Sequence, residues 1–265
     1  MIARPGTRVA FQGERGAFSE EAAVTALGSA IEPVACRSFD VVFASVERGE
    51  TELGVVPIEN SLAGSIHRNY DLLLRHKLCI VGETQMRVEH CLIANPGVRL
   101  EDVRLVRSHP QALAQCERRL EELGVEVEAA TDTAGSVLAL RESGATDAAA
   151  LASRLAAEVY GMAILRESME DNEQNLTRFL FLGREPASAY QGESKTSIVF
   201  ALENRPAALF RALACFALRD IDLTKIESRP LPGSPWQYRF YLDFIGSQHD
   251  EVGRRALDHL NEMAT

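Results

Sequence analysis

The chain has 265 residues, of which 46% are apolar and 25% carry a charge, and these proportions are ordinary for a globular protein with a sizeable core. The formal net charge of −10 argues against nucleic acid or an anionic membrane as the main partner. The five cysteines form no C-x-x-C pair, and the first residues contain no apolar secretory segment, so we expect a protein of the reducing cytosol.

Segments with the patterns of strands and helices alternate up to about residue 183. RVAFQG, residues 8–13, predicts a strand, and SEEAAVTALG, residues 19–28, predicts a helix with Ser19 as its N-cap. Residues 110–124 predict one helix, with Pro110 at its first position. The other expected strands are 53–60, two runs within 77–94, 103–110, 125–130 and 147–153, and the other expected helices are 38–50, 64–76, 132–144 and 153–161. Such alternation predicts mostly parallel sheets with helices on both faces.

One hydrophobic core seldom grows to this size, so we expect lobe one at about residues 1–85 and 166–185 and lobe two at about residues 86–165. The extended run 79–94 is long enough to cross from one lobe to the other, and the polar run 161–179 can bring the chain back. The buried strand that ends near Gly183 would then lie beside the cleft between the lobes, where α/β proteins collect ligands.

The pattern changes after about residue 185. Residues 186–195 predict a linker, because they are rich in loop-forming residues. The order strand, helix, strand, strand, helix follows, at residues 196–203, 205–220, 222–230, 236–246 and 247–263. This order predicts a ferredoxin-like module that lacks its last strand.

Four polar clusters fall where the expected elements meet: ERGAFS at 14–19, PIENSLAG at 57–64, SHPQALAQC at 108–116 and NLTRF at 175–179. Each has an ordinary structural interpretation, such as a turn, a capping box of Ser108 with Gln111, or a β-forming threonine. Thr177 and Arg178 are neighbours in an expected strand, so they reach one ligand only if the backbone there is irregular. The residues alone predict a two-lobed protein that binds a small acid, with no metal or nucleotide motif.

Taken in order, GERGAFS, VVPIENSLAGSI, SHPQALAQC and NLTRFLFLG resemble the motifs of prephenate dehydratase, and IESRP followed by WQYRFYLDFIG resembles its ACT regulatory domain. The resemblance implies an α/β protein: a two-lobed, periplasmic-binding-protein-like catalytic domain at 1–185, a linker at 186–195, and a ferredoxin-like ACT domain without its last strand at 196–265. It implies conversion of prephenate to phenylpyruvate, water and carbon dioxide in phenylalanine biosynthesis, with no cofactor and no metal.

By the same resemblance, Thr177 is the family's essential threonine, and its hydroxyl would assist the departing ring hydroxyl of the substrate. A threonine is a poor acid, so the proton would come from Glu59 or from His109, and the sequence leaves both open. Arg178 and free N–H groups at a helix N-terminus suit the pyruvyl carboxylate. The residues expected to contact the substrate are Ser19, Asn60, Ser61, Gln111, Asn175, Arg178 and Phe179.

The ACT resemblance implies L-phenylalanine as an allosteric effector and a homodimer or homotetramer, because such modules generally pair across subunits. Ala207 stands where the family commonly has glycine in Pro-Gly-Ala-Leu, which places an added Cβ next to the expected pocket. The expected effector site consists of Asn204, Pro206, Ala207, Ala208, Leu209, Glu227, Ser228, Arg229 and Pro230.

Three other interpretations fit parts of the sequence. The substrate could be arogenate, in which an amino group replaces the keto oxygen of prephenate. A non-catalytic solute-binding protein has the same two-lobed fold, but such proteins are usually exported, and the expected absence of a secretory signal counts against it. A pure amino-acid sensor would need only the last module, and the full set of cleft motifs counts against that.

Overall fold

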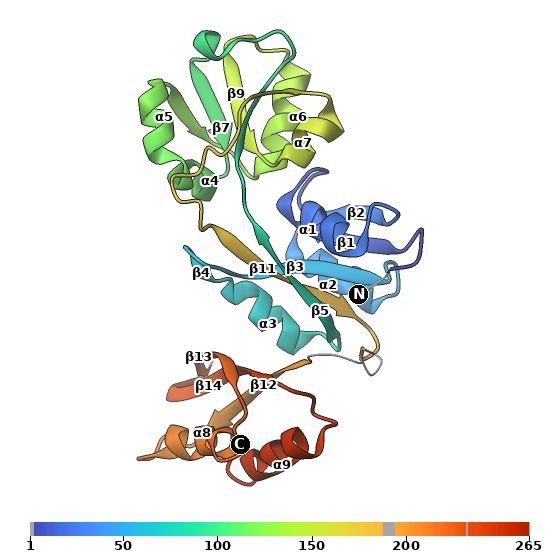
Figure 1. Ribbon diagram of the computed structural model, residues 1–265, viewed down its shortest axis with the longest axis vertical. Coiled ribbons are helices and arrows are strands. Elements are labelled where there is room, and N and C mark those ends of the chain that lie inside the picture. The colour runs from blue at the N-terminus through green and yellow to red at the C-terminus, as the bar shows by residue number, and fades with distance from the viewer. Residues whose placement is uncertain (1–2, 188–193, 232, 265) are drawn as a thin grey trace. The chain divides into compact units, whose positions relative to one another are not determined.

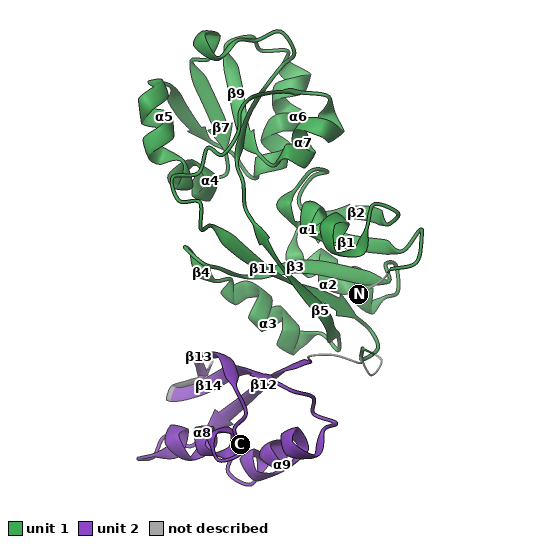
Figure 2. Cartoon of the chain, viewed as in Figure 1, with its two compact units in different colours: residues 1–187 green, residues 188–265 purple. Residues whose placement is uncertain are grey.

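The computed structural model describes residues 3–187, 194–231 and 233–264 (Figure 1). The chain divides into two compact units, Met1–Ala187 and Ser188–Thr265 (Figure 2). The expected linker at 186–195 falls mainly on residues 188–193, which lie outside the described part of the chain.

The first lobe of unit 1 contains β1 (Arg8–Gln12), β2 (Glu32–Cys36), β3 (Leu53–Asn60), β4 (Gly64–Ser65), β5 (Cys79–Arg87) and β11 (Leu176–Gly183), with helices α1 (Phe18–Leu27), α2 (Phe39–Glu47) and α3 (His67–Arg75). The sheet order is β2-β1-β3-β11-β5, and β4 pairs with β3. β1 is parallel to β2 and β3, whereas β11 is antiparallel to β3 and β5. The prediction of mostly parallel sheets is therefore wrong here, because β11 re-enters this sheet from the second lobe.

Helices cover both faces of this sheet, and β3 shows the division. Val55 packs with Phe179 and Phe181 of β11 in the cluster that α1 covers. The preceding residue, Gly54, faces α2, where a Cβ added to it would lie 2.9 Å from Cγ2 of Val46. The apolar run at 179–182 is thus a buried strand, as its pattern predicts.

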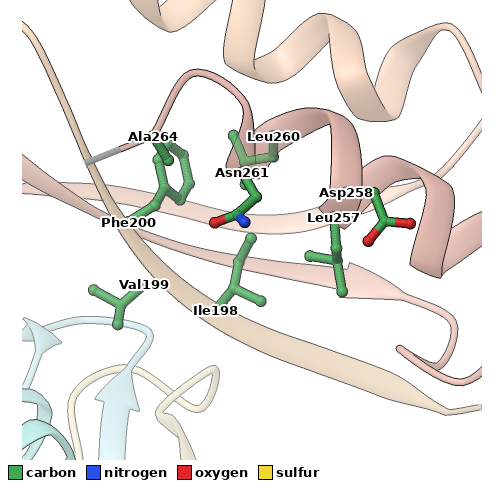
Figure 3. A pocket seen from close by; sticks show the side chains of 8 residues that line it. All are labelled: Ile198, Val199, Phe200, Leu257, Asp258, Leu260, Asn261 and Ala264. Atoms are coloured by element: carbon green, nitrogen blue, oxygen red, sulfur yellow. The ribbon is translucent and has the colours of Figure 1, made fainter.

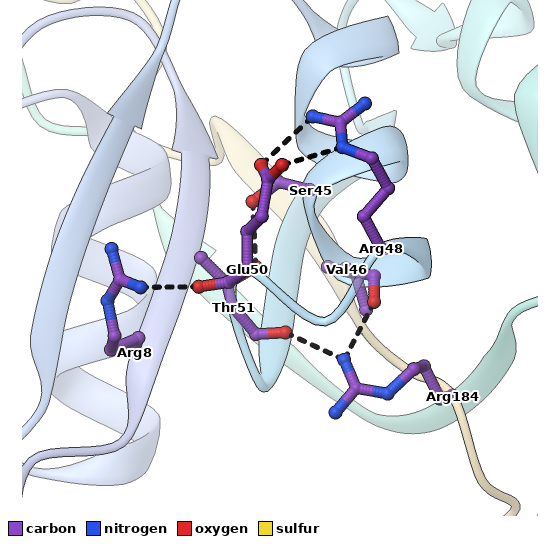
Figure 4. A network of polar contacts seen from close by, with 7 residues as sticks. All are labelled: Arg8, Ser45, Val46, Arg48, Glu50, Thr51 and Arg184. Atoms are coloured by element: carbon purple, nitrogen blue, oxygen red, sulfur yellow. Dashed lines mark hydrogen bonds and ion pairs between the residues drawn. The ribbon is translucent and has the colours of Figure 1, made fainter.

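The C-terminal end of α2 is tied to the strands on either side of it (Figure 4). Arg184, just after β11, donates from Nη1 to the carbonyl oxygens of Val46 at 2.8 Å and Thr51 at 3.1 Å. Arg8 of β1 donates to the carbonyl oxygen of Glu50 at 2.6 Å. These bonds join the end of α2 and the turn that follows it to β1 and to the end of β11.

The second lobe contains β6 (Cys91–Ala94), β7 (Leu105–Ser108), β8 (Glu126–Ala129), β9 (Ala148–Ala152) and β10 (Ala163–Arg166), with helices α4 (Pro110–Gln115), α5 (Glu117–Leu123), α6 (Thr133–Ser143) and α7 (Arg154–Tyr160) and the 3₁₀ turn η1 (Leu100–Asp102). The sheet order is β10-β6-β9-β7-β8. β9 is buried throughout: Ala148, Ala150 and Ala152 pack into one core cluster, and Ala149 and Leu151 into the other. Two α/β lobes therefore form unit 1, as the sequence predicts.

The single helix expected at 110–124 is two helices that meet at Cys116, whose φ of −119° and ψ of 14° end α4. The cause lies far away in sequence. The carboxylate of Asp171 accepts from the N–H groups of Arg118 at 3.0 Å and Arg119 at 3.3 Å, and so caps α5. The backbone N–H of Asp171 also donates to the carbonyl oxygen of Gln115 at 2.8 Å, so the segment that leaves the second lobe fixes the end of α4.

Unit 2 contains β12 (Lys195–Leu202), α8 (Ala208–Ala217), β13 (Leu223–Leu231), β14 (Ser234–Ile245) and α9 (Glu251–Asn261). Its described strands form an antiparallel sheet in the order β12-β14-β13. Phe216 of α8 packs on Phe244 of β14, with ring centroids 5.3 Å apart, inside a core that also contains Ala256 and Leu260 of α9. This is the strand–helix–strand–strand–helix order read from the sequence.

Candidate functional site

Thr177 is buried at the start of β11, where 6% of it is exposed. It pairs directly with Asn60, the last residue of β3, so their side chains share one face of the sheet. Asn60 Nδ2 donates to Thr177 Oγ1 at 2.8 Å and to Asn175 Oδ1 at 2.7 Å. The ends of β3 and β11 thus bring together three of the residues that the sequence singled out.

The backbone fixes the orientation of the Asn60 amide. The N–H groups of Leu62 and Ala63 donate to Asn60 Oδ1 at 3.1 Å and 2.9 Å, so the other end of the amide is the NH₂ group. That NH₂ group donates to Thr177 Oγ1, which therefore acts as an acceptor toward Asn60. The hydroxyl proton of Thr177 remains for another acceptor, because Asn60 is the only hydrogen-bond partner of its side chain among residues 3–187.

The network continues to residues that the sequence interpretation missed. Asn175 Nδ2 donates to Gln115 Oε1 at 3.2 Å, and His90 Nε2 lies 2.9 Å from the same oxygen. Gln115 belongs to α4 in the second lobe, so it joins the two lobes at the site. The sequence held one signal for it, since Gln115 is one helical turn after Gln111 in the same motif. Gln111 itself is exposed.

Glu59 and Arg178 lie on the opposite face of the sheet from Thr177. They pair directly across β3 and β11, each next in sequence to a member of the Asn60–Thr177 pair. The irregularity between β11 and β3 comes only after Arg178, so it does not turn Arg178 toward the side of Thr177. Arg178 pairs with Glu83 of β5, with Nη2 and Oε2 2.6 Å apart. This placement does not support Arg178 as the residue that binds the substrate carboxylate beside Thr177.

The other expected site residues have structural contacts. Ser61 closes the β3–β11 junction, because its Oγ donates to the carbonyl oxygen of Gln174 at 2.7 Å and accepts from the N–H of Leu176 at 3.0 Å. Phe179 lies in the core of the first lobe, with 2% exposed. Ser19 is a buried residue inside the first turn of α1, whose N-cap is Ala17, so the prediction of Ser19 as the cap is wrong.

His109 is the N-cap of α4, and its Nδ1 accepts from the N–H of Gln111 at 3.2 Å. The predicted capping box of Ser108 with Gln111 is wrong. Ser108 is fully buried at the end of β7, and its hydroxyl donates to the carbonyl oxygen of Leu151 at 2.6 Å. Since Nδ1 of His109 accepts a hydrogen bond, a proton on this ring sits on Nε2.

The loop 14–19 contacts the second lobe. The carbonyl oxygen of Gly16 accepts from the hydroxyl of Ser153, the N-cap of α7, at 2.5 Å. Gly16 has a φ of +86°, and a Cβ added to it would lie 2.4 Å from Cα of Ala156. Glu20, with 1% exposed, holds the loop by accepting from the N–H of Gly16 at 2.7 Å. A glycine is required here by conformation and by close approach.

Glu21 lies on α1 among carboxylates from other segments. The pKa of Glu21 is raised from 4.5 to about 7. Burial is the largest cause, the negative charges of Glu89 and Glu158 add to it, and the positive charge of Arg154 opposes them. Because the folded-state pKa lies above the ordinary value, the folded state holds this proton more tightly than the unfolded chain. Glu21 therefore contributes to the free energy of unfolding of unit 1 below about pH 4.5, and this contribution is lost as the pH rises through about 7.

We therefore expect Glu21→Gln to stabilise unit 1 at pH 8 by on the order of 2 kcal/mol, because the variant carries no charge there. Near pH 4.5 the substitution should change stability little. Thermal unfolding at both pH values measures the difference. The matched control is Glu142→Gln, at an exposed position of α6, which should have little effect at either pH. Equal effects of Glu21→Gln at both pH values would contradict this assignment.

In unit 2, the two expected effector segments reach the same end of the sheet. Tyr238 of β14 pairs with Leu202 of β12 on one side and with Pro230 of β13 on the other. The turn that carries Asn204 to Leu209 follows Leu202 directly, so it begins beside the end of the Glu227–Pro230 segment. Glu227 forms an ion pair with Lys225 at 3.4 Å.

A pocket of unit 2 lies elsewhere, between β12 and α9 (Figure 3). Its lining residues are Ile198, Val199, Phe200, Leu257, Asp258, Leu260, Asn261 and Ala264. None of them belongs to the expected effector site. Among the described residues, no group of three or more His, Cys, Asp or Glu side chains could hold a metal ion, and no helix is long and apolar enough to cross a membrane.

Comparison with known proteins gives consistent matches. A family model described as prephenate dehydratase matches residues 9–187. The chain is 54% identical over 268 residues to arogenate dehydratase/prephenate dehydratase 2, chloroplastic, of Arabidopsis thaliana, covering 97% of this chain and 70% of that protein. The structure of prephenate dehydratase in complex with L-Phe from Arthrobacter aurescens is similar, with a TM-score of 0.87, 31% identity, and coverage of 97% of this chain and 86% of that one. So is that of GqqA, described as a novel type of quorum quenching acylase, with a TM-score of 0.89, 38% identity, and coverage of 97% and 94%.

The prediction of a cytosolic protein is contradicted by these relatives. Three Arabidopsis thaliana relatives, including the one above, are named as chloroplastic. The prediction failed because an apolar secretory segment marks only the secretory route. Plastid-directing segments are amphipathic and poor in acidic residues, so the lack of an apolar segment says nothing about them.

Proposed function

The chain belongs to the prephenate dehydratase family, and from this premise we propose that it converts prephenate to phenylpyruvate, water and carbon dioxide in phenylalanine biosynthesis. The observation that carries the proposal is the buried hydroxyl of Thr177, whose oxygen accepts from Asn60 and whose proton is therefore available to a ligand. A fixed donor at the leaving hydroxyl would stabilise the negative charge that develops on its oxygen as the C–O bond breaks.

The neutral character of the network suits the other half of the reaction. The ring carboxylate leaves as carbon dioxide, and the electron pair of its C–C bond enters the ring as the hydroxyl departs. Asn60, Asn175 and Gln115 offer oriented dipoles without a formal charge. A carboxylate beside such groups is solvated less well than in water, and dispersal of its charge into the ring relieves that loss.

The departing hydroxyl needs one proton to leave as water. Of the two expected sources, Glu59 lies on the face of the sheet opposite Thr177. His109 begins the helix that carries Gln115, and its imidazolium form would be the proton source, because the neutral ring is too weak an acid. This placement favours His109, so His109→Asn should depress kcat near neutral pH more than Glu59→Gln does, in pH–rate profiles of both variants.

Incubation with prephenate, followed by measurement of phenylpyruvate absorbance, tests the proposal directly. Arogenate dehydratase is the second candidate, because several relatives that are 45–54% identical carry that name. The ratio of kcat/KM for the two substrates decides between them. Turnover of neither substrate would reject both.

An acylase activity, as the description of GqqA suggests for that protein, finds less support at this site. A threonine nucleophile needs a base that takes its proton. The Thr177 side chain has the amide of Asn60 as its partner, and that amide donates a hydrogen bond rather than accepting the proton. This arrangement favours hydrogen-bond donation by Thr177 over nucleophilic attack.

We propose that unit 2 is an ACT domain that binds L-phenylalanine at Asn204–Leu209 and Glu227–Pro230 and pairs with a second subunit. Two observations support this. The two segments meet at one end of the sheet, and the Arthrobacter aurescens relative was solved with L-Phe. Binding there would regulate the cleft if the effector favours one arrangement of the subunits. Isothermal titration of phenylalanine, with the molecular mass measured by light scattering, tests both parts.

Ala207 has a φ of 64°, in the left-handed region, just before α8. We therefore expect Ala207→Gly to stabilise unit 2 by about 1 kcal/mol, because glycine adopts this conformation without strain. Turnover without phenylalanine should stay the same, and inhibition by phenylalanine should tighten or stay unchanged. Ala208→Gly, inside the first turn of α8, is the matched control and should destabilise by roughly 0.5–1 kcal/mol. Thermal unfolding of the two variants shows whether their effects on stability have opposite signs. Destabilisation by Ala207→Gly would show that the backbone of Ala207 is not strained.

A further inference from the structure

The network around Thr177 ends at a histidine that the proposed chemistry does not use. His90 lies between β5 and β6, where the chain passes from the first lobe to the second, and 2% of it is exposed. Its Nε2 lies 2.9 Å from Gln115 Oε1, while its Nδ1 is buried without a hydrogen-bond partner among the described residues. Buried polar atoms without partners are uncommon, so the two nitrogens of this ring are not equivalent sites for its hydrogen.

The hydrogen-bond directions determine which nitrogen of His90 carries the proton. The Asn60 amide has one orientation, set by two backbone N–H groups, and its NH₂ group donates to Asn175 Oδ1. Asn175 must then present its own NH₂ group to Gln115, so the Gln115 atom that it meets is Oε1. The same oxygen faces His90 Nε2, and an oxygen can only accept, so Nε2 carries the hydrogen.

The surroundings of His90 keep the ring neutral and fixed. Burial lowers the pKa of His90, although its bond to Gln115 and the charge of Glu170 oppose this. A proton on Nδ1 would be a buried donor with no acceptor. The ring meets Phe18 edge-on, with centroids 5.2 Å apart. Its backbone N–H donates to Glu170 Oε2 at 2.9 Å, and its carbonyl oxygen accepts from the N–H of Met169 at 2.8 Å.

We propose that His90, as the neutral Nε2–H tautomer, is a positioning residue that holds Gln115 and through it Asn175, and so keeps the partners of Asn60 in place beside Thr177. Without the His90 donor, the Gln115 amide is free to turn over and present its NH₂ group to the NH₂ group of Asn175. Two donors would then face each other, and Asn175 would lose the orientation in which it accepts from Asn60. Two donors therefore converge on Gln115 Oε1: Asn175, at the end of the series that starts at the backbone N–H groups, and His90 from the other side.

Nitrogen-15 NMR of the imidazole tests the tautomer without any assay of turnover. In the wild-type protein we expect one neutral Nε2–H form of His90 at neutral pH. Gln115→Leu removes the acceptor and should release the ring to a mixture of tautomers. An Nδ1–H form or an imidazolium in the wild-type protein would overturn the inference, as would an unchanged tautomer in Gln115→Leu.

The kinetic test rests on the proposed function. His90→Leu should lower kcat for the better of the two substrates by on the order of tenfold or more, with a smaller change in KM, because the donor at the reacting hydroxyl is displaced rather than removed. His90→Gln, whose amide nitrogen can occupy the place of Nε2, should recover most of that loss. In the His90→Leu/Gln115→Leu double variant the two losses should not add, since both act through one bond.

His76→Leu is the matched control. His76 is a partly buried ring in the first lobe that contacts Phe43 and pairs with Glu47, outside the network, and its loss should leave kcat unchanged. A His90→Gln variant as impaired as His90→Leu, or full activity in a folded His90→Leu, would overturn the positioning role. If His90→Leu does not fold, comparison of His90→Gln with Gln115→Leu decides, and the inference fails unless His90→Gln is the more active. No turnover by the wild-type enzyme would reject the proposed function, while the tautomer measurement would still test the hydrogen-bond order.

Discussion

Thr177→Ala is expected to leave the fold intact and to lower kcat by roughly 10²–10³, because one well-placed donor at a developing negative charge is lost. In the variant, one N–H of the Asn60 amide still donates to Asn175 Oδ1, and the N–H that loses Thr177 Oγ1 has the carbonyl oxygen of Leu176 at 3.3 Å from Nδ2. No buried donor is therefore left without an acceptor, and the loss reports chemistry more than stability.

Thr177→Ser is the matched control, because it keeps the hydroxyl and removes only a methyl group. It should retain most of the activity. Steady-state kinetics with prephenate and with arogenate, together with thermal unfolding, measure both variants. An active Thr177→Ala enzyme would remove Thr177 from the mechanism, whereas loss of activity in both variants would show that packing at this position matters more than the hydroxyl.

Gly16→Ala is expected to destabilise unit 1 by about 2–4 kcal/mol, through backbone strain and overpacking together. The φ of Gly16 is +86°, and the new Cβ would lie 2.4 Å from Cα of Ala156, a backbone atom of the second lobe that cannot turn aside. Relief requires the loop 14–19 to move away from α7, which would break the bond between Ser153 and the carbonyl oxygen of Gly16.

Gly144→Ala separates the two contributions, because Gly144 has a φ of +64° but open space around its Cα. It should cost only the strain, about 1 kcal/mol. Differential scanning calorimetry of both variants gives the comparison, followed through the transition of unit 1. If Gly16→Ala and Gly144→Ala lower the free energy of unfolding equally, the contact between the loop and α7 does not contribute to stability.

The family assignment drawn from the motifs is confirmed by the match over residues 9–187. The prediction succeeded because it depended on short local motifs. PIENS, HPQAL and TRF lie at strand ends or at the start of a helix, where polar side chains are most informative about ligands. The cytosolic assignment failed because it rested on an absent segment. The ACT domain, its effector and the oligomeric state stay proposals.

Several predicted helices and strands were missed or misplaced, mostly where contacts from distant residues determine the structure. β2 was not predicted, because EPVAC shows no clear alternation, and it is a strand through its parallel pairing with β1. The expected helix at 110–124 is broken because Asp171 caps α5 from 52 residues away. Ser19 looked like an N-cap, yet α1 begins one residue earlier and the carboxylate that ties down its loop belongs to Glu20.

By itself, the sequence determined the α/β class, the buried strand at 179–182 and the polar residues at its mouth, because hydrophobic period and strand-end position are local properties of the chain. Only the tertiary structure decided which of those polar residues act together. Strand register put Thr177 beside Asn60 and turned Arg178 and Glu59 to the other face. The residue of the second lobe that joins the network is Gln115, not Gln111. His90 joins it from the segment between β5 and β6, where the chain passes from the first lobe to the second. The backbone N–H groups of Leu62 and Ala63 orient Asn60, and the directions of the other bonds follow because Asn175 and Gln115, distant in sequence, meet it only in the folded chain.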